Sequence, residues 1–351
     1  MLDAIVEEVG EEHVVQVVTD NAPAYKAAGN LLMRKRKKLY WTPCVAHCID
    51  LMLEKLFELP QMKNAYLKAN RVANCIYSHG YVLDMMRSFT KRGLIRPGDT
   101  RFATANLTLQ SLLQNKQALE EMFTYNKWKN CEWLSKSDGK DVKKIILRDQ
   151  TFWPGLVYSL KEMKPLVGVL RLVDAENVPA MEFIYGAMDM AKEALAAKYD
   201  GDVSKYREIW NIIDEKWDFQ MHRDLHAAGY FLNLQFQYED DFSDHTEIRH
   251  GLYNVMEKLL PREDLADAHL ELDKYCNKEG CFGRLEAEIT RKLKTPDLEE
   301  LDFPSLGIDT ATQNDEPEPS DLPAQQRMRE RDSVVGVGSA GSGRGQHSKR
   351  G

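Results

Sequence analysis

Several features that would assign a class of protein at once are missing from this sequence. No apolar run reaches the roughly 18 residues that a membrane-spanning helix needs, so no membrane partner is expected. The first eight residues lack the basic and then apolar order of a secretory signal. Six cysteines in 351 residues do not make a disulfide framework. Together these absences favour reduced thiols in a nuclear or cytosolic protein.

Common catalytic motifs are missing as well. The chain has no Walker loop, no G-x-G-x-x-G, no G-x-S-x-G and no paired C-x-x-C. Its net charge of −8 disfavours a protein that coats nucleic acid through its overall field, but it leaves room for a local DNA groove. The compact basic run at 34–38 fits a solvated helix end, a phosphate contact or a nuclear-import patch.

The beginning of the chain has the pattern of a small α/β unit. A short helix is expected over 3–9, a buried strand over 14–18 and a second strand over 39–41. The turn at 20–23 opens a helix that runs to about Lys37. Thr42 and Pro43 are expected to cap and begin an apolar helix that ends near Leu59. Strand, helix and strand in this order predict a parallel pair with a right-handed crossover.

Beyond Pro60, strand signals almost vanish and apolar residues recur at three- and four-residue spacing. One such stripe runs from Leu156 to Leu170 and another from Met181 to Leu195, and both are interpreted as core. Further helices are predicted over 63–90, 105–123, 142–147, 203–213, 247–260, 262–276 and 283–293. The fold class predicted is therefore mostly α with a small α/β part.

Composition divides the chain into three parts. Residues 1–60 form the α/β part and residues 61–300 a large helical region. Residues 301–351 are rich in Asp, Glu, Pro, Ser and Gly and end in low-complexity sequence. Too little apolar surface is present there to offset the entropy of ordering, so a disordered tail is predicted.

Asp20 is the first candidate for chemistry because it follows a hydrophobic strand. Its carboxylate would lie at the carboxyl end of that strand, where α/β folds place their sites. A carboxylate there can hold Mg²⁺ or Mn²⁺ for two-metal phosphodiester chemistry, which needs several converging oxygens. The alternative is an aspartate that only caps a turn.

Cys44-x-x-His47 is the second candidate. Cys44, His47 and Cys48 would share one helix face and would supply half of a zinc site. The second half has no match at suitable spacing, since Cys276 and Cys281 lie far away in the sequence. Packed polar residues on a core helix are the alternative interpretation.

The third candidate is Arg101-Phe102, at the entrance of a predicted helix. An Arg beside an aromatic ring can hold a phosphate and stack on an extruded base, although the same pair is common in helix caps. His222-x-x-x-His226 has the spacing of a zinc-binding helix but lacks the Glu that a metalloprotease needs after the first His.

In their residues and in their order along the chain, these elements resemble blocks of hAT-family DNA transposases. The resemblance is to the plant branch in particular, which carries the domain of unknown function DUF659. The resemblance covers roughly residues 1–295. The blocks are Val17-Val18-Thr19-Asp20-Asn21-Ala22, Cys44-x-x-His47, Thr100-Arg101-Phe102, Trp210-x-x-Ile213-Asp214-x-x-Trp217 and Leu225-His226-Ala227-Ala228-Gly229-Tyr230-Phe231-Leu232-Asn233.

The resemblance implies an RNase H-like core with a large helical insertion. It implies an Asp, Asp and Glu set that holds two divalent metals for DNA strand cleavage and transfer. Asp20 matches the second Asp, and Cys44 and His47 match a C-x-x-H element near the active site. Arg101 and Phe102 match an Arg-Trp pair that handles a flipped base. Phe102 replaces the Trp, which preserves stacking but loses the indole N–H donor.

The departures from the family pattern predict a piece truncated at both ends. The first Asp belongs on an earlier strand, and no strand precedes the one before Asp20. The third residue, Glu, has no match, and the Trp-, Cys- and Ser-rich dimerisation segment is not recognisable, so a homodimer formed through it is not expected. The family's zinc-finger DNA-binding domain is also missing. One carboxylate does not hold two metals, so functional metal binding is not expected.

These observations lead to a nuclear, transposon-derived and catalytically incomplete protein with residual DNA binding; a cytoplasmic location is the alternative. Two other readings stay open. One is a fragment of an active metal-dependent DNA transposase that has all three carboxylates. The other is a domesticated scaffold in which the helical region binds proteins.

Overall fold

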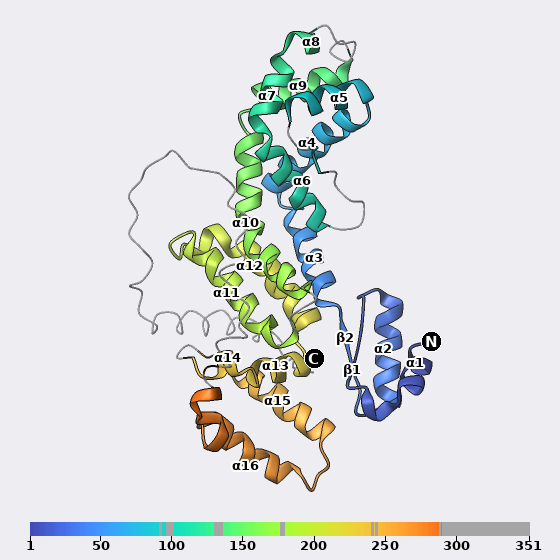
Figure 1. The fold of residues 1–351 in the computed structure, drawn as a ribbon, viewed down its shortest axis with the longest axis vertical. Coiled ribbons are helices and arrows are strands. Elements are labelled where there is room, and N and C mark those ends of the chain that lie inside the picture. Colours follow the sequence, from blue (N-terminus) through green and yellow to red (C-terminus); the bar gives the residue numbers. More distant parts are fainter. Residues whose placement is uncertain are drawn as a thin grey trace, which may run out of the picture. The chain divides into compact units, whose positions relative to one another are not determined.

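A computed structural model of the chain shows a small α/β part joined to a large set of helices (Figure 1). The structure describes residues 1–90, 93–95, 102–129, 136–175, 180–239, 242, 245–287 and 289. Within these residues helix predominates, and the strands are two parallel strands of one sheet. The predicted fold class, mostly α with a small α/β part, is confirmed.

The α/β part comprises two strands, their neighbouring helices and one short 3₁₀ turn. Its elements are α1 (Leu2–Val9), η1 (Glu11–His13), β1 (Gln16–Thr19), α2 (Pro23–Lys35) and β2 (Tyr40–Pro43). The strands pair in parallel with Gln16 opposite Tyr40 and Thr19 opposite Pro43. Pro23 occupies the first turn of α2, where its missing N–H costs nothing. The predicted strand–helix–strand order and the parallel pairing are therefore present.

Successive side chains of β2 point to opposite faces of the sheet, and both faces are covered. Trp41 lies against α2 at Gly29, where a Cβ would come within 2.2 Å of the indole Cγ. Its indole N–H donates to Oγ1 of Thr19 at 3.0 Å. Tyr40 belongs instead to an apolar cluster formed with the C-terminal helices. The β1 strand is less protected, since Val18 is 52% exposed.

One predicted boundary in this part is wrong. Thr42 and Pro43 do not cap and begin a helix; both lie in β2, and the next helix, α3 (Val45–Leu56), begins after Cys44. Thr42 is buried and its hydroxyl accepts from Nε2 of Gln16 at 2.7 Å. This cross-strand hydrogen bond gives the Thr42 side chain a partner within the sheet, where the sequence pattern had suggested a helix cap.

The helical region continues from α3 and is built around α10 (Phe152–Val173), which packs against α3, α4, α6 and α11. The five apolar residues of the stripe from Leu156 to Leu170 are all buried, as predicted: Leu156, Leu160, Met163, Val167 and Leu170. The remaining helices of this part are α4 (Pro60–Tyr77), α5 (Gly80–Phe89), α6 (Phe102–Gln114), α7 (Lys116–Thr124), α8 (Asn126–Lys129), α9 (Ser137–Arg148), the 3₁₀ turn η3 (Ala180–Phe183), α11 (Ile184–Ala197) and α12 (Val203–Lys216).

Two long helices predicted from the apolar spacing are each divided in the structure. The segment 63–90 breaks at Ser78 and His79, where His79 takes an extended backbone. The segment 105–123 breaks at Asn115, whose side chain donates back to the carbonyl of Ser111 at 2.8 Å. Polar side chains that hydrogen-bond to the local backbone interrupt a helix without interrupting the apolar period, which is why the period alone did not show these breaks.

A π-helical turn, η4 (Trp217–Met221), leads to the last described helices. They are α13 (Asp224–Phe231), α14 (Leu234–Gln237), α15 (Thr246–Leu259), α16 (Leu265–Cys276) and the 3₁₀ turn η5 (Gly280–Gly283). Helices α13 and α15 cross closely at Gly251, where a Cβ would lie 2.6 Å from Cβ of Ala227. Tyr40 of β2 packs into this cluster, and Nζ of Lys258 lies 3.5 Å from the centre of its ring.

The described residues form one compact unit, so the boundary between 1–60 and 61–300 remains a prediction. The predicted disordered tail, 301–351, lies outside the described residues, as does most of the predicted helix 283–293. Among the described helices none is both long and apolar enough to span a bilayer.

Candidate functional site

The parallel register brings two of the predicted site residues to the same edge of the sheet. Thr19 and Pro43 are the last paired residues of β1 and β2, so Asp20 and Cys44 each follow the carboxyl end of a strand. The backbone N–H of Cys44 donates to the carbonyl of Thr19 at 2.6 Å, which fixes the two chain segments side by side. Strand carboxyl ends are where α/β folds place their ligands, so this edge is the candidate site.

Asp20 is exposed at this edge and has a local structural contact. Its Oδ1 accepts a hydrogen bond from the backbone N–H of Ala22 at 3.0 Å. Ala22 immediately precedes α2, so the carboxylate organises the turn that opens this helix. An aspartate bonded to its own backbone two residues on is a common turn element. The capping interpretation of Asp20 therefore has direct geometric support.

The Cys44-x-x-His47 element begins α3. Cys44 precedes the first helical residue and His47 lies in the first turn, and both side chains are half-buried. Cys48 is fully buried, and burial raises the pKa of its thiol to about 12, with the nearby Cys44 adding to the increase. The Cys48 thiol therefore stays protonated at neutral pH and is a poor metal ligand, because metals bind the thiolate.

The edge does not have the composition of a two-metal centre. Such chemistry requires several carboxylate oxygens that converge on the ions. Across the described ranges, no three His, Cys, Asp or Glu side chains come together in a way that could hold a metal ion. Asp20, Cys44 and His47 thus do not fit the divalent-metal pair that the family resemblance implies.

Positive charge from the helical region acts on Cys48, one turn of α3 beyond this edge. Lys216 in the last turn of α12 and Arg223 just before α13 both act on the Cys48 thiol, and their charges oppose the increase in its pKa. Helix α3 packs against α12 and η4, which explains how these distant residues approach Cys48. The candidate site is therefore an exposed carboxylate and a half-buried Cys-His pair, while the charges of Lys216 and Arg223 act on Cys48, one turn further along α3.

The other predicted DNA-contacting pair cannot be placed. Arg101 lies outside the described residues, and Phe102 begins α6 while its side chain is not described. Phe102 at the start of a helix agrees with the predicted helix entrance. The roles of Arg101 and Phe102 in handling a base stay predictions.

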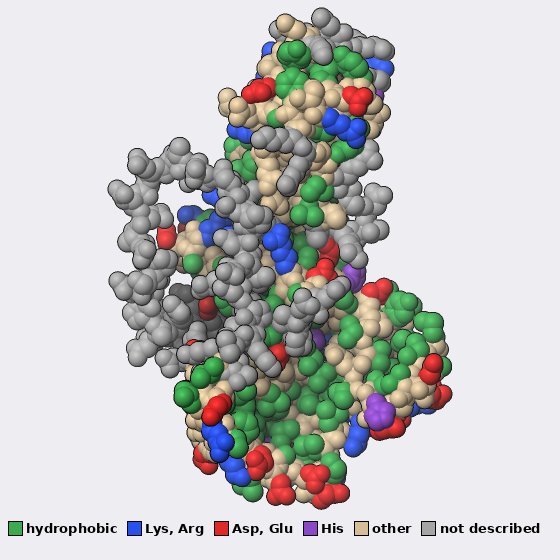
Figure 2. Space-filling model, in the orientation of Figure 1, with side chains coloured by type: hydrophobic (Ala, Val, Ile, Leu, Met, Phe, Trp, Pro, Cys, Tyr) green, Lys and Arg blue, Asp and Glu red, His purple; other side chains and the backbone are tan. Residues whose placement is uncertain are grey.

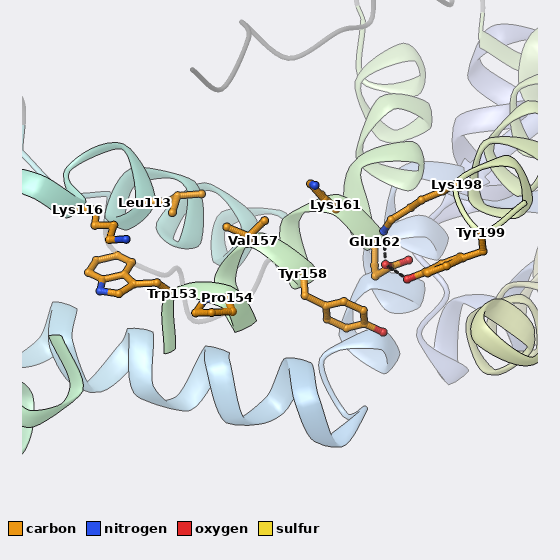
Figure 3. Close-up of a pocket in the computed structure, with 10 residues that line it drawn as sticks. All are labelled: Leu113, Lys116, Trp153, Pro154, Val157, Tyr158, Lys161, Glu162, Lys198 and Tyr199. Carbon is orange, nitrogen blue, oxygen red and sulfur yellow. Dashed lines mark hydrogen bonds and ion pairs between the residues drawn. The ribbon is translucent and has the colours of Figure 1, made fainter. Parts of the chain in front are cut away.

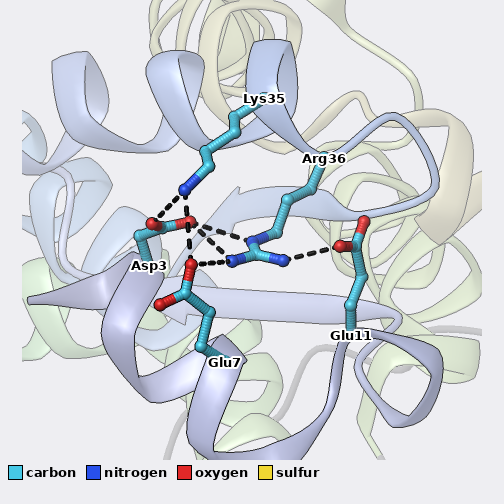
Figure 4. A network of polar contacts seen from close by, with 5 residues as sticks. All are labelled: Asp3, Glu7, Glu11, Lys35 and Arg36. Atoms are coloured by element: carbon cyan, nitrogen blue, oxygen red, sulfur yellow. Dashed lines mark hydrogen bonds and ion pairs between the residues drawn. The ribbon is translucent and has the colours of Figure 1, made fainter.

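The basic run at 34–38 lies at the end of helix α2, which agrees with its interpretation as a helix end. Much of its charge is paired. Lys35 closes α2 and Arg36 follows it. The guanidinium of Arg36 contacts three carboxylates, at 2.8 Å, 3.0 Å and 2.6 Å (Figure 4). These belong to Asp3, Glu7 and Glu11. The Arg36 side chain is only 7% exposed, so it is not available to a phosphate.

Lys35 joins the same network, and its Nζ lies 2.5 Å from Oδ2 of Asp3. The hydrogen bond from Lys35 lowers the pKa of the Asp3 carboxyl. Arg34, Lys37 and Lys38 are exposed and are the members of the run that could meet a polyanion. On the face shown in Figure 2, the coloured Lys and Arg side chains are scattered and do not form one broad basic patch.

His222 and His226 do not form a metal-binding helix face. His226 is 1% exposed, and its Nδ1 lies 2.9 Å from the carbonyl of Met221. Burial lowers the pKa of His226, so the ring is neutral at neutral pH. His222 precedes α13 and lies near Glu247, with 3.8 Å between ring nitrogen and carboxylate. Both histidines have structural positions.

A group of residues that the sequence did not single out lies on α10. Glu162 is buried within an apolar helix and contacts Lys198 and Tyr199 (Figure 3). In the sequence, Glu162 was passed over within the apolar stripe that includes its neighbour Met163. The signal in the sequence was the carboxylate itself. A Glu within an apolar stripe is unfavourable to bury unless it has partners, so it indicates a polar contact.

Comparison with known proteins identifies one segment. Residues 1–72 match the family model described as a domain of unknown function, DUF659, which is a hAT-associated domain family. No curated protein and no solved structure matches the chain. The matched segment contains the whole two-stranded sheet, Asp20, Cys44 and His47. The part of the chain that holds the candidate site is therefore a hAT-related, DUF659-type segment.

Proposed function

We propose that this chain is a transposon-derived, hAT-related protein that contacts DNA at the sheet edge without cutting it by itself. The observation that carries the proposal is the position of Asp20 and Cys44 at the carboxyl ends of two paired parallel strands, inside the segment that matches DUF659. A plant origin, an RNase H-like core and a nuclear location belong to the same proposal.

The inability to cut is inferred from what the edge residues do. Asp20 uses one carboxylate oxygen to bond the N–H of Ala22, and the buried Cys48 keeps its proton. Neither arrangement favours a bound pair of divalent cations, because Asp20 leaves them only its second oxygen and Cys48 would first have to lose its proton. Asp20 therefore acts as a turn residue, and Mg²⁺ or Mn²⁺ is not functionally bound.

Contact with DNA is inferred from the cations that act on Cys48, one turn of α3 beyond the edge. Lys216 and Arg223 bring positive charge to a chain whose net charge is −8, so binding is local and weak and does not spread over the surface. Phosphate contacts of this kind are independent of sequence and decrease in strength with salt. His47 is half-buried in the first turn of α3 and adds a hydrogen-bonding group.

The proposal is tested by the anisotropy of a fluorescent DNA duplex titrated with the full chain at several salt concentrations. We expect weak binding whose affinity falls as salt rises. The Lys216→Ala variant should reduce the slope of log affinity against log salt by about 1, as the loss of one phosphate contact does. Lys140→Ala, which removes an exposed lysine of α9 far along the chain, is the matched control and should leave the slope unchanged.

Absence of salt-dependent binding above a micromolar background would contradict DNA contact and would favour the alternative of a protein-binding scaffold. Equal slopes for the wild type and Lys216→Ala would show that binding occurs elsewhere than at the sheet edge.

A further inference from the structure

Among the described residues, the outer edge of β1 has no neighbouring strand. The sheet has the order β1–β2, so β1 pairs with β2 along one side and its other side is open. Strand β1 has its main packing contact with β2, whereas β2 also contacts α2 and η4. An open strand edge presents backbone N–H and C=O groups to which a further strand can add.

The hydrogen-bonding groups of this edge follow from the parallel register. The carbonyls of Val15 and Thr19 accept from backbone N–H groups at the beginning and just past the end of β2, at 2.8 Å and 2.6 Å. Because the backbone groups of successive residues in a strand point to opposite sides, the N–H and C=O of Gln16 and Val18 point away from β2. No described residue hydrogen-bonds to these four groups. They are therefore available to a strand that lies along β1.

The side chains along this edge are uncharged and mostly apolar. Val15 and Val18 are about half exposed, and on α1 the same holds for Ile5 and Val9, which lie one turn apart. Figure 2 shows hydrophobic side chains at the surface of the α/β part. Proteins commonly protect an open strand edge with Lys, Pro or an inward-pointing charge, and none of these occurs in 14–19. The edge therefore favours a partner that is itself an apolar β-strand.

We propose that this edge pairs with the same edge of a second copy of the chain. The two β1 strands run antiparallel and are related by a two-fold axis at Val17. Gln16 of each copy then lies opposite Val18 of the other, and each of these pairs exchanges two hydrogen bonds. Four hydrogen bonds therefore use every outward group of both strands. The joined sheet has four strands, and this association does not rest on the DNA contact proposed above.

A second copy fits this edge for two reasons. Its strand is already ordered by β2, so pairing does not require the entropy that an unfolded peptide loses on ordering. The side chains also match, because Val17 of one copy meets Val17 of the other on the face that holds the small apolar cluster of Val6, Leu32 and Leu39. The contact extends this cluster across the axis. The dimer is weak, since one short strand per copy buries less than the roughly 800 Å² per partner of a standard interface.

The first test is sedimentation velocity of the full chain from micromolar concentrations upward, where we expect a concentration-dependent dimer. Val18→Pro removes the outward N–H and keeps the hydrogen bonds between β1 and β2. Two of the four bonds across the axis are then lost, so the affinity of the dimer should fall by about tenfold or more. Val18→Thr keeps the N–H and the branched side chain, and as the matched control it should dimerise nearly as the wild type does.

The second test concerns the register. At the axis, the Cα atoms of the two Val17 residues are about 4.5 Å apart, which a disulfide can bridge. The two Val15 residues are separated by about 13 Å along the strands, at about 3.3 Å per residue. With the exposed Cys281 replaced by Ser, Val17→Cys should give a cross-linked dimer with oxidised glutathione. Val15→Cys, at a more exposed position, is the control and should not.

Circular dichroism of each variant separates loss of pairing from loss of the fold, and the two cysteine variants serve as the test if Val18→Pro does not fold. A wild type that stays monomeric at every concentration would overturn the proposal. So would a dimer that Val18→Pro leaves unchanged, because the outward N–H would then play no part. Cross-linking of Val15→Cys equal to that of Val17→Cys would also contradict it, since the strands would not meet at this axis.

Discussion

Residues 1–43 and the helical region differ in how they are held together. In the α/β part, Val6, Leu32 and Leu39 form a small apolar cluster of their own, and an ion network ties α1 to the end of α2. From α3 to η4 the helical region has one continuous core that includes most of α10, and a second apolar cluster joins α13, α15 and α16. The stability of the α/β part therefore depends on a few specific contacts, whereas that of the helical region depends on many apolar contacts.

A second contrast concerns exposure. Of the two strands, β2 is buried on both faces, whereas Val15 and Val18 near and in β1 are about half exposed. Two strands rarely form an independent sheet. The contact of Tyr40 with α13 and α15 supplies the support that the sheet lacks, so the helical region stabilises the candidate site. We expect the α/β part to open locally at lower free energy than the helical core.

The largest effect should come from the helical core. Leu156 on α10 is fully buried, and Leu156→Ala removes its side chain from the shared core. We expect a loss of about 3 kcal/mol in unfolding free energy, within the range for buried leucines. Denaturant unfolding followed by circular dichroism measures it, and hydrogen exchange should increase throughout the helical region. A loss confined to α10 would show that the core is not continuous.

The next effect should be confined to the α/β part. Gly29→Ala places a Cβ 2.2 Å from Cγ of Trp41, so α2 or the indole must move. We expect a cost of about 2–3 kcal/mol from overpacking. Hydrogen exchange should increase in α2 and β2 while α10 keeps its protection. Asn30→Ala, an exposed neighbour on α2, is the control and should change little. Equal exposure of α10 in Gly29→Ala would show that the two parts unfold together.

Acid should affect both parts through carboxylates whose pKa is lowered. The hydrogen bond from Lys68 lowers the pKa of Asp149 to about 2, from 3.8 in the unfolded chain. A lowered pKa gives stability that is present above pH 4 and lost as the pH falls to about 2. Against Asp149→Asn, the wild type should be more stable by about 1 kcal/mol at pH 7, with the difference vanishing near pH 2. A difference that grows as the pH falls would contradict this sign.

The same rule applies to Asp3 in the α/β part, where the hydrogen bond from Lys35 lowers the pKa. Its stabilising contribution is also present above the unfolded pKa and is lost as the pH falls through the folded value. Asp3→Asn should therefore reduce the protection of α1 from hydrogen exchange at neutral pH but have little effect on it in acid. Hydrogen exchange measured at both pH values would show the difference.

The smallest effect should come from the contact between the two parts. The Tyr40 hydroxyl is buried without a hydrogen-bond partner, and the ring packs under Lys258. Tyr40→Phe keeps the ring and removes the unsatisfied hydroxyl, so stability should be unchanged or higher by up to about 1 kcal/mol. Tyr40→Ala is the contrast and should loosen the α/β part. A marked loss of stability in Tyr40→Phe would mean that the hydroxyl has a partner after all.

The fold class followed from the sequence because its signals are local. The β-branched run before Asp20 and the three- and four-residue apolar spacing around Leu156 depend on near neighbours, and both gave the correct element. The boundary at Thr42 was wrong because its hydroxyl is used across the strand by Gln16, a contact that local pattern cannot show. The breaks at Ser78 and Asn115 were missed for a different reason, because polar side chains that bond the local backbone end a helix without changing the apolar period.

For the candidate site, Asp20 was predicted at the end of a strand and Cys44 in the first turn of a helix; Cys44 instead precedes α3, and the parallel register makes the two residues neighbours. The pairing of Arg36 with three carboxylates was not predicted, because Asp3, Glu7 and Glu11 are about 30 residues away from it. The polar contacts of Glu162 join segments that are distant in the sequence, so no single stretch of sequence contains them.

The claim that Asp20 organises a turn and does not hold a catalytic metal is tested most directly by incubating a supercoiled plasmid with the full chain and Mn²⁺, with Asp20→Asn alongside. Asn preserves the acceptor for the Ala22 N–H and removes the charge. We expect no nicking above the protein-free background by either protein. Nicking by the wild type that Asp20→Asn abolishes would contradict it.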